Sequence, residues 1–137
     1  MKNSYIIKAD VSELETASVK VSDALLSAGA DHKVAYKVRL SLDEILTNVV
    51  SYAYDNNEGN IEISYDINES ERYIDISVTD EGKAFNPLEE VKEPDFSLDL
   101  HERKIGGLGL FIVKNSMDEV KYLRKDNKNI LMMKKYY

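Results

Sequence analysis

Two stretches in which apolar and polar residues strictly alternate limit the possible folds of this chain more than any other feature. The first runs from Ile61 to Ile67 and the second from Ile74 to Thr79. A period of two places successive side chains on opposite faces of a strand, so each stretch predicts a strand with one buried face. The polar connection Asn68 to Glu71 between them predicts an antiparallel hairpin that is half buried against a layer of helices.

Two segments before this hairpin have helical spacing instead. Apolar residues recur every three or four positions from Ser12 to Ala28, where Ser12 and Glu15 form a capping-box pattern that predicts the helix start. Gly29 predicts the stop of this helix. A second helix is expected after Asp31, which can cap it, and its apolar stripe continues to Ala53 before the turn residues 56–60.

The rest of the chain completes a single sheet. Residues 5–9 predict a first strand, and residues 119–125 and 129–135 predict a closing hairpin. Leu110, Val113 and Met117 indicate a third helix between the two hairpins. The order predicts an α+β protein, a two-layer α/β sandwich whose mixed, mostly antiparallel sheet carries helices on one face. No linker divides the chain, so one domain over residues 1–137 is expected.

Composition narrows the class of partner. The formal net charge of −7 disfavours direct nucleic-acid binding, which depends on Lys and Arg neutralising phosphates. No apolar run approaches the roughly 20 residues that cross a bilayer, so no membrane association is expected. The absence of cysteine excludes a disulfide framework and a thiolate metal site. These features predict a cytoplasmic protein.

Glu44 and Asn48 lie four positions apart on the second predicted helix, and so share one of its faces. Mg²⁺ takes oxygen ligands and keeps several waters, so the Asn48 carbonyl could be a ligand. Glu44 could hold a water molecule or abstract a proton. The alternative is an ordinary solvated pair, which the two residues alone do not exclude.

Two glycine-bearing stretches follow. Asp80 ends an alternating strand two residues before Gly82, and its carboxylate could accept the exocyclic N–H of adenine, although a plain turn is the alternative. Residues 106–109 read Gly-Gly-Leu-Gly and open the third predicted helix, whose free N–H groups suit a phosphate. This stretch is neither a P-loop nor part of a Rossmann unit.

In combination these blocks resemble the GHKL (Bergerat) ATPase family. The shared pattern is Glu-x-x-x-Asn on a helix, Asp-x-Gly-x-Ala after a hairpin, a long loop, and Gly-x-Gly opening a helix. Residues 47–54 (Thr-Asn-Val-Val-Ser-Tyr-Ala-Tyr) and 117–120 (Met-Asp-Glu-Val) are especially similar to the anti-sigma serine/threonine kinases of partner-switching systems.

The resemblance implies the roles of five residues on the base and metal side. Asn48 would bind Mg²⁺, and Glu44 would act as general base or position the attacking group. Asp80 would contact the adenine amine, with Gly82 and Ala84 admitting the base.

The resemblance also implies a phosphate side. Gly107, Leu108 and Gly109 would lie against the phosphates of ATP, and a mobile ATP lid would cover about residues 83–106, within the long loop 80–105. The implied cofactors are therefore ATP and Mg²⁺.

This chain departs from the family pattern at two places. Arg103 and Lys104 are separated from Gly107 by two residues, whereas many members have an arginine close before the Gly-x-Gly. Lys128-Asn129 stands where many members have Gly-Thr, which predicts a weaker contact on the adenine side.

The implied function is an ATP-binding anti-sigma factor with serine/threonine protein kinase activity. Its implied partners are a sigma factor, which it would sequester, and a small anti-anti-sigma protein, which it would phosphorylate; a homodimer is also implied. Two alternatives remain open. One is a non-catalytic regulatory module in which ATP only shapes a binding surface. The other is a stand-alone catalytic domain of the histidine-kinase type.

Overall fold

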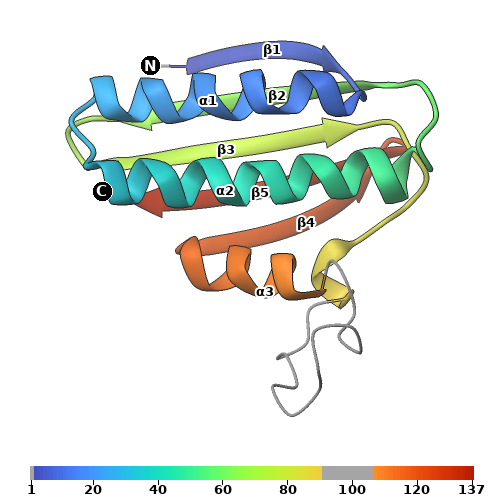
Figure 1. The fold of residues 1–137 in the computed structure, drawn as a ribbon. Coiled ribbons are helices and arrows are strands. Elements are labelled where there is room, and N and C mark those ends of the chain that lie inside the picture. Colours follow the sequence, from blue (N-terminus) through green and yellow to red (C-terminus); the bar gives the residue numbers. More distant parts are fainter. Residues whose placement is uncertain (1, 91–106) are drawn as a thin grey trace.

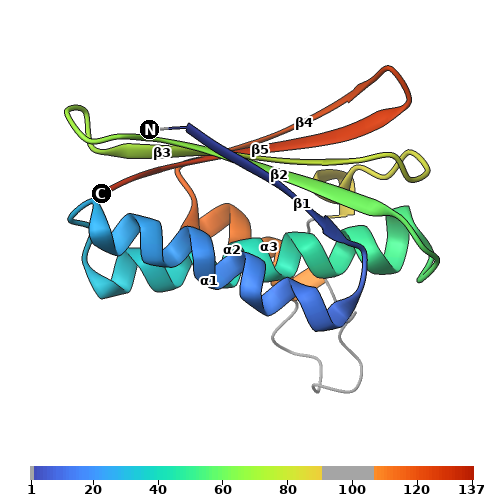
Figure 2. The same cartoon turned by 90° about the horizontal axis from the view of Figure 1, so that it is seen from above.

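A computed structural model describes residues 2–90 and 107–137 and shows two layers, a sheet and the helices that cover one of its faces (Figures 1 and 2). This confirms the predicted α/β sandwich. The elements are β1 (Lys2–Lys8), α1 (Val11–Ser27), α2 (His32–Asn48), the π-helical turn η1 (Val49–Ala53), β2 (Asn60–Asn68), β3 (Tyr73–Asp80), the 3₁₀ turn η2 (Pro87–Glu90), α3 (Gly107–Ser116), β4 (Glu119–Lys125) and β5 (Lys128–Tyr136).

The sheet has the strand order β1-β2-β3-β5-β4. Both predicted hairpins are present, as the pairs β2–β3 and β4–β5. All four pairings among the described strands are antiparallel. The sheet was predicted to be mixed and mostly antiparallel, but no parallel pair occurs among these strands. Asp126 and Asn127 connect β4 to β5 with φ of 53° and 61°, the positive values that a two-residue hairpin turn requires.

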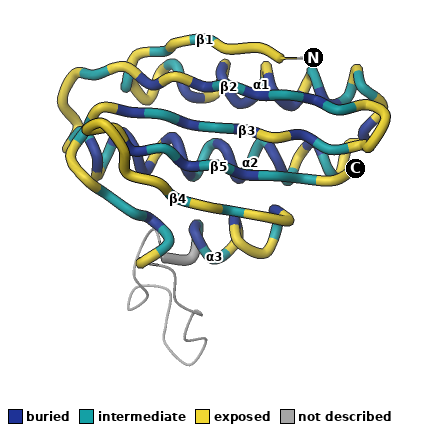
Figure 3. Tube along the Cα trace, turned by 180° about the vertical axis from the view of Figure 1, so that it is seen from behind, coloured by how far each residue is buried: buried dark blue, intermediate teal, exposed yellow. Residues whose placement is uncertain are grey.

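The core lies between the helices and the inner face of the sheet. Residues along β2 and β3 alternate between buried and more exposed positions. Figure 3 shows the sheet from its uncovered side, with the chain coloured by the burial of each residue. Isoleucines at the inner positions are fully buried, and burying such a side chain stabilises the fold by about 1.5–3 kcal/mol. A few polar residues are also buried, and three of them are Asn48, Asp80 and Asn129.

The boundaries predicted for the first helix hold within one residue, but its predicted cap was wrong. Asp10, and not Ser12, caps α1, because its carboxylate accepts the Ser12 N–H at 3.0 Å. Glu15 instead pairs with Arg39 of α2 at 3.2 Å. Asp31 caps α2 as predicted, accepting the Val34 N–H at 2.8 Å.

The second helix changes its winding immediately after Asn48. The apolar stripe predicted to reach Ala53 is buried, but residues 49–53 form the π-helical turn η1. Such π-helical turns are rare in proteins, and those that occur are often found at functional sites. Here the turn presents the Ala53 carbonyl to the Lys83 N–H, at 2.9 Å, so that it anchors the segment that follows β3.

Candidate functional site

A small cavity lies where α2 and η1 meet the inner face of the sheet and the segment after β3. Its lining includes Asn48, Asp80, Phe85, Tyr122 and Asn129. The volume of this cavity that is open to water is only about 20 Å³. Two of the predicted site residues, Asn48 and Asp80, therefore share one cavity although they are far apart in the sequence.

Asp80 ends β3 with its side chain turned inward, and only 3% of the residue is exposed. Its Oδ1 accepts two hydrogen bonds of 2.9 Å, one from the Gly82 N–H and one from the Asn129 side-chain amide. Burial raises the pKa of the Asp80 carboxyl, against the opposing effect of these two donors and of Arg124. No hydrogen bond between described residues reaches the second oxygen, Oδ2, which is the acceptor available to a ligand.

Asn129 is a site residue that the sequence analysis did not propose. Its amide nitrogen donates to Asp80 and also to the Lys83 carbonyl at 2.8 Å. Its oxygen accepts from the Phe85 N–H at 3.2 Å and from the Tyr122 hydroxyl. The sequence analysis predicted only a weaker adenine-side contact from Lys128-Asn129 in place of Gly-Thr. In the structure, Asn129 also connects Asp80, the segment 83–85 and β4 by hydrogen bonds. The only signal in the sequence was that departure.

Gly82 has a structural role in addition to its predicted role of admitting the base. A Cβ at this position would overlap the backbone carbonyl of Ala53 in η1, so the glycine permits close packing within the protein. The Gly82 carbonyl accepts from Arg124 at 2.9 Å. Ala84 is exposed, and the next residue, Phe85, lines the cavity and stacks on Tyr52 with ring centroids 5.1 Å apart.

Asn48 is buried, and its side-chain nitrogen donates to the Glu44 carbonyl at 2.7 Å. A backbone carbonyl can only accept, so this bond fixes the orientation of the amide. The Asn48 Oδ1 accepts none of the hydrogen bonds found between described residues. As an amide oxygen, Asn48 Oδ1 fits a Mg²⁺ ion that takes one ligand from the protein and completes its coordination shell with phosphate and water oxygens. No cluster of three or more acidic, His or Cys side chains suited to a metal occurs in residues 2–90 and 107–137.

Glu44 lies on the same face of α2, against α3. A Cβ at Gly109 would overlap the Glu44 carboxylate, so the glycine allows the carboxylate to lie against the first turn of α3. Burial, and then the charge of Asp43, raise the pKa of the Glu44 carboxyl. None of the hydrogen bonds between described residues reaches this carboxylate. Asp43 faces the other way and accepts from the buried Ser18 hydroxyl at 2.5 Å.

Gly107 and Leu108 are the first two residues of α3, ahead of Gly109. They therefore lie at the helix N-terminus that the sequence analysis predicted for the phosphates. The predicted lid, about residues 83–106, lies outside the described residues from residue 91 onward. Its described part contains the Phe85 contact and the turn η2.

Comparison with known proteins identifies the family of this chain. Residues 7–135 match the model of the histidine kinase-like ATPase domain, so the chain belongs to that family. A TM-score of 0.68 relates it, at 16% identity, to a crystal structure of the RsbU and RsbW domains of Rv1364c from Mycobacterium tuberculosis. The match covers 99% of this chain and 32% of that one, and at this identity it establishes the fold alone.

Curated relatives narrow the family further. The chain is 30% identical to the serine-protein kinase RsbW of Staphylococcus aureus, over 93% of this chain and 82% of the relative. It is also 30% identical to the protein of the same name from Oceanobacillus iheyensis, over 88% of this chain and 77% of that relative. The serine-protein kinase RsbW of Listeria monocytogenes is also 30% identical to this chain, over 78% of this chain and 69% of the relative. Within the ATPase family, the chain belongs with the serine-protein kinases RsbW.

A search of the described helices for a possible membrane span found none.

Proposed function

We propose that this protein is an ATP-dependent protein kinase that phosphorylates a serine or threonine of a small anti-anti-sigma protein and sequesters a sigma factor. The proposal includes a single domain over residues 1–137, a lid over about 83–106 and a cytoplasmic location. The observation that carries it is the packing of Glu44 against Gly109, because it brings a carboxylate of raised pKa to the proposed phosphate end of the site.

ATP would lie between α2 and the start of α3. The Asp80 Oδ2 would accept the adenine amine while Asn129 holds the other carboxylate oxygen. The backbone N–H groups of residues 107–109 would face the phosphates, because the first N–H groups of a helix have no partner within it. Mg²⁺, held by the Asn48 Oδ1, would neutralise negative charge on the phosphates.

Glu44 would accept the proton of the attacking hydroxyl. A general base works best when its pKa is close to the working pH, and the raised pKa of Glu44 moves it in that direction. The transfer otherwise depends on positioning and on charge neutralisation, more than on covalent chemistry by the enzyme.

Binding a purine also requires a local movement. The cavity has room for about one water molecule, so Phe85 would have to leave its stack on Tyr52. Asn129 holds the backbone of residues 83 and 85, and therefore connects this movement to the orientation of Asp80.

The decisive experiment is a phosphorylation assay with the purified protein, Mg²⁺, labelled ATP and small anti-anti-sigma-like proteins encoded near its gene. Labelling of one partner on serine or threonine would support the kinase. ATP binding and sigma-factor binding without phosphorylation of any partner would leave only the regulatory module. Labelling of a histidine would favour the histidine-kinase type of catalytic domain. A readout by intact mass and phospho-residue mapping distinguishes these outcomes.

A further inference from the structure

The stretch 47–54 contains two tyrosines, and the second of them has no part in the proposed function. Tyr54 follows the π-helical turn η1 directly and is half-buried. Its ring lies against Gly59, where a Cβ would overlap the ring, including the carbon that carries the hydroxyl. The glycine therefore leaves a slot for the ring, and packing determines the position of the Tyr54 hydroxyl.

The Tyr54 hydroxyl joins two segments that are distant in the sequence. It accepts a hydrogen bond of 2.8 Å from the Glu81 N–H and donates one of 2.6 Å to the Asn60 carbonyl. Both directions are determined, because a backbone N–H only donates and a carbonyl only accepts. Burial is the main cause that raises the pKa of this hydroxyl, so it keeps the proton that it donates. Tyr54 thus connects the start of β2 to the residue that follows β3.

The bond to Glu81 lies beside Asp80, the residue proposed to recognise the base. The Glu81 N–H belongs to the peptide that joins these two residues. The Gly82 N–H, one residue further on, donates to the Asp80 Oδ1 at 2.9 Å. An Asp side chain bonded to the backbone two positions on forms an Asx turn, which closes only when the peptides between them are correctly oriented. The orientation of the Asp80 carboxylate therefore depends on the peptide that Tyr54 holds.

The winding of η1 directs Tyr54 toward this peptide. The Tyr54 N–H bonds to the Val49 carbonyl at 3.0 Å, five positions back, where an α-helix would use the residue four positions back. A turn with one extra residue rotates the residues after it by roughly 100° about the helix axis. The same turn presents the Ala53 carbonyl to the Lys83 N–H at 2.9 Å. Two consecutive residues at the end of the turn thus hold the backbone of residues 81 and 83.

We propose that Tyr54 is a positioning residue of the nucleotide site, whose hydroxyl holds the peptide between Asp80 and Glu81 and so orients the Asp80 carboxylate toward the exocyclic amine of the purine. This inference rests on the proposed function, because it requires that Asp80 binds that amine. The Tyr54 hydroxyl is already bonded to backbone groups on two sides, so its effect on the base passes through Asp80.

A residue that only stabilises the fold would behave differently. Losing its hydrogen bonds would lower the free energy of unfolding, and would weaken the binding of all purine nucleotides alike or of none. A positioning residue acts on one contact, that between Asp80 and the amine. The ratio of the affinities for two nucleotides that differ only in this amine therefore separates the two roles.

Tyr54→Phe keeps the ring in its slot and removes only the hydroxyl. In calorimetry with Mg²⁺, the affinity of this variant for ATP should fall about three- to tenfold, the range that one hydrogen bond between neutral groups contributes. Its affinity for the triphosphate of purine riboside, which has a hydrogen in place of the amine, should stay unchanged. Gly59→Ala, whose added Cβ would displace the ring, should change the ratio of the two affinities in the same direction.

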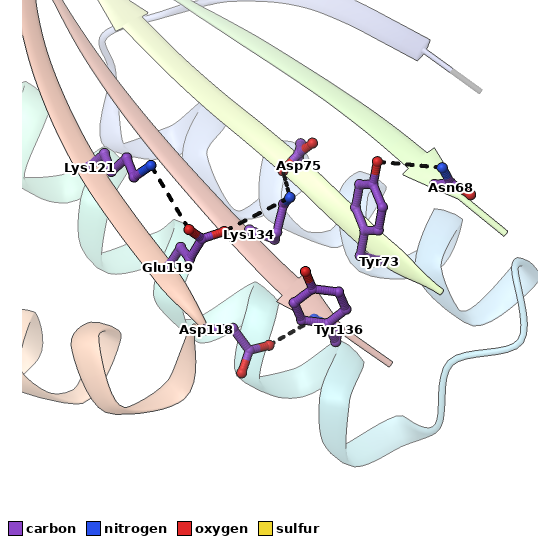
Figure 4. A network of polar contacts seen from close by, with 8 residues as sticks. All are labelled: Asn68, Tyr73, Asp75, Asp118, Glu119, Lys121, Lys134 and Tyr136. Carbon is purple, nitrogen blue, oxygen red and sulfur yellow. Dashed lines mark hydrogen bonds and ion pairs between the residues drawn. The ribbon is translucent and has the colours of Figure 1, made fainter. Parts of the chain in front are cut away.

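Two matched control variants each remove a tyrosine hydroxyl elsewhere on the sheet. The Tyr5 hydroxyl donates to the Ala17 carbonyl at 2.8 Å, on the edge strand β1. Figure 4 shows Tyr73, whose hydroxyl accepts from the Asn68 amide at 3.4 Å, at the opposite end of β3 from Asp80. Tyr5→Phe and Tyr73→Phe should leave the ratio of the two affinities unchanged, and urea unfolding checks that every variant is folded.

A double variant tests whether the effect of Tyr54 passes through Asp80. If it does, Tyr54→Phe should cost less ATP affinity in the Asp80→Asn background than in the wild-type chain, because both changes act on one contact. Losses that simply add would show two independent effects and would overturn the proposal.

Hydrogen exchange gives a readout that needs no nucleotide. NMR of the protein without nucleotide should show faster exchange of the Glu81 and Gly82 amide hydrogens in Tyr54→Phe than in wild type. The Glu81 amide loses its acceptor, and the Gly82 amide loses the support of the peptide before it. Unchanged exchange of both amides would overturn the proposal.

The binding results also separate this inference from the proposed function. A wild-type chain that binds neither nucleotide would contradict the proposed function and this inference together. If wild type prefers ATP, but Tyr54→Phe loses affinity for both nucleotides equally or for neither, this inference alone is overturned. A selective loss of ATP affinity together with faster exchange at Glu81 supports it.

Discussion

The two ends of the candidate site are constructed in opposite ways. At the end near β3 and β5, Asp80 and Asn129 are buried and joined to each other and to the backbone of residues 82, 83 and 85 by hydrogen bonds. At the end near α3, the Glu44 carboxylate is half-buried against Gly109, without a hydrogen bond from the described residues. The first arrangement suits rigid recognition of a base. The second leaves a carboxylate available to take a proton.

The largest expected effect is at the Glu44 end. Glu44→Gln keeps the size of the side chain and removes the base, so phosphorylation of the partner should fall by about 10²–10⁴-fold. ATP affinity, measured by calorimetry, should stay close to the wild-type value. The matched control is Asp43→Asn, the adjacent carboxylate that faces Ser18. Phosphorylation by Glu44→Gln at the wild-type rate would show that Glu44 is not the base.

At the other end, Asn129→Ala should reduce stability most. The change leaves the Lys83 carbonyl, the Phe85 N–H and the Tyr122 hydroxyl without their partner. A fully buried polar group left unpaired costs about 1–3 kcal/mol. These three groups are only part-buried, so water can replace Asn129 at some of them, and we expect a loss of about 2–4 kcal/mol in denaturant unfolding.

Tyr122→Phe is the control for this change, because it removes one hydrogen bond and leaves the rest of the Asn129 contacts in place. It should lower the free energy of unfolding by about 0.5–1.5 kcal/mol. Equal losses for the two variants would mean that Asn129 contributes only its bond to Tyr122.

Asp80→Asn should have opposite effects on binding and stability. It keeps an acceptor for Gly82 and Asn129 but weakens the acceptor offered to adenine, so ATP affinity should fall by about 1.5–3 kcal/mol, the value of a hydrogen bond to a charged group. A purine nucleotide that lacks the exocyclic amine should bind both variants equally. An equal loss for both nucleotides would indicate that Asp80 has only a structural role.

The stability part follows from the raised pKa of Asp80. Because its folded-state pKa lies above the unfolded one, ionisation opposes folding as the pH rises through that interval. Asp80→Asn should therefore be more stable than wild type at neutral pH, and the difference should shrink as the pH falls below the ordinary range of an Asp carboxyl. Urea unfolding at a series of pH values measures this.

The smallest effect concerns the pH dependence of phosphorylation. In a pH–rate profile, the rate should fall on the acidic side as Glu44 becomes protonated. The midpoint of this acidic limb should lie above the ordinary pKa range of a glutamate, because the Glu44 pKa is raised. Asp43 contributes to that rise, so Asp43→Asn should move the limb to lower pH. A limb that stays in place would show that another group controls the rate.

The sequence predicted the elements of this fold because their signals are local. Residues 61–67 and 74–79 alternate with period two, and the helices repeat every three or four residues, so neighbouring residues suffice to determine which face is buried. The turn Asp126-Asn127 and the cap Asp31 are likewise set within a few positions. Glu44 and Asn48 share a face for the same local reason.

Contacts between distant elements were decided only by the tertiary structure. Asn129 meets Asp80 because β5, and not β4, pairs with β3, and the two residues lie opposite each other in that register. Gly82 is needed because the π-helical turn brings Ala53 against it, and Gly109 because α3 packs on Glu44. On the face of the sheet that the helices leave uncovered, the charged residues of separate strands form one row only because the five strands align; this row is Lys2, Asp66, Asp75, Lys134 and Glu119. A residue pattern along the chain encodes which face is buried, whereas strand order and helix packing determine which distant residues meet.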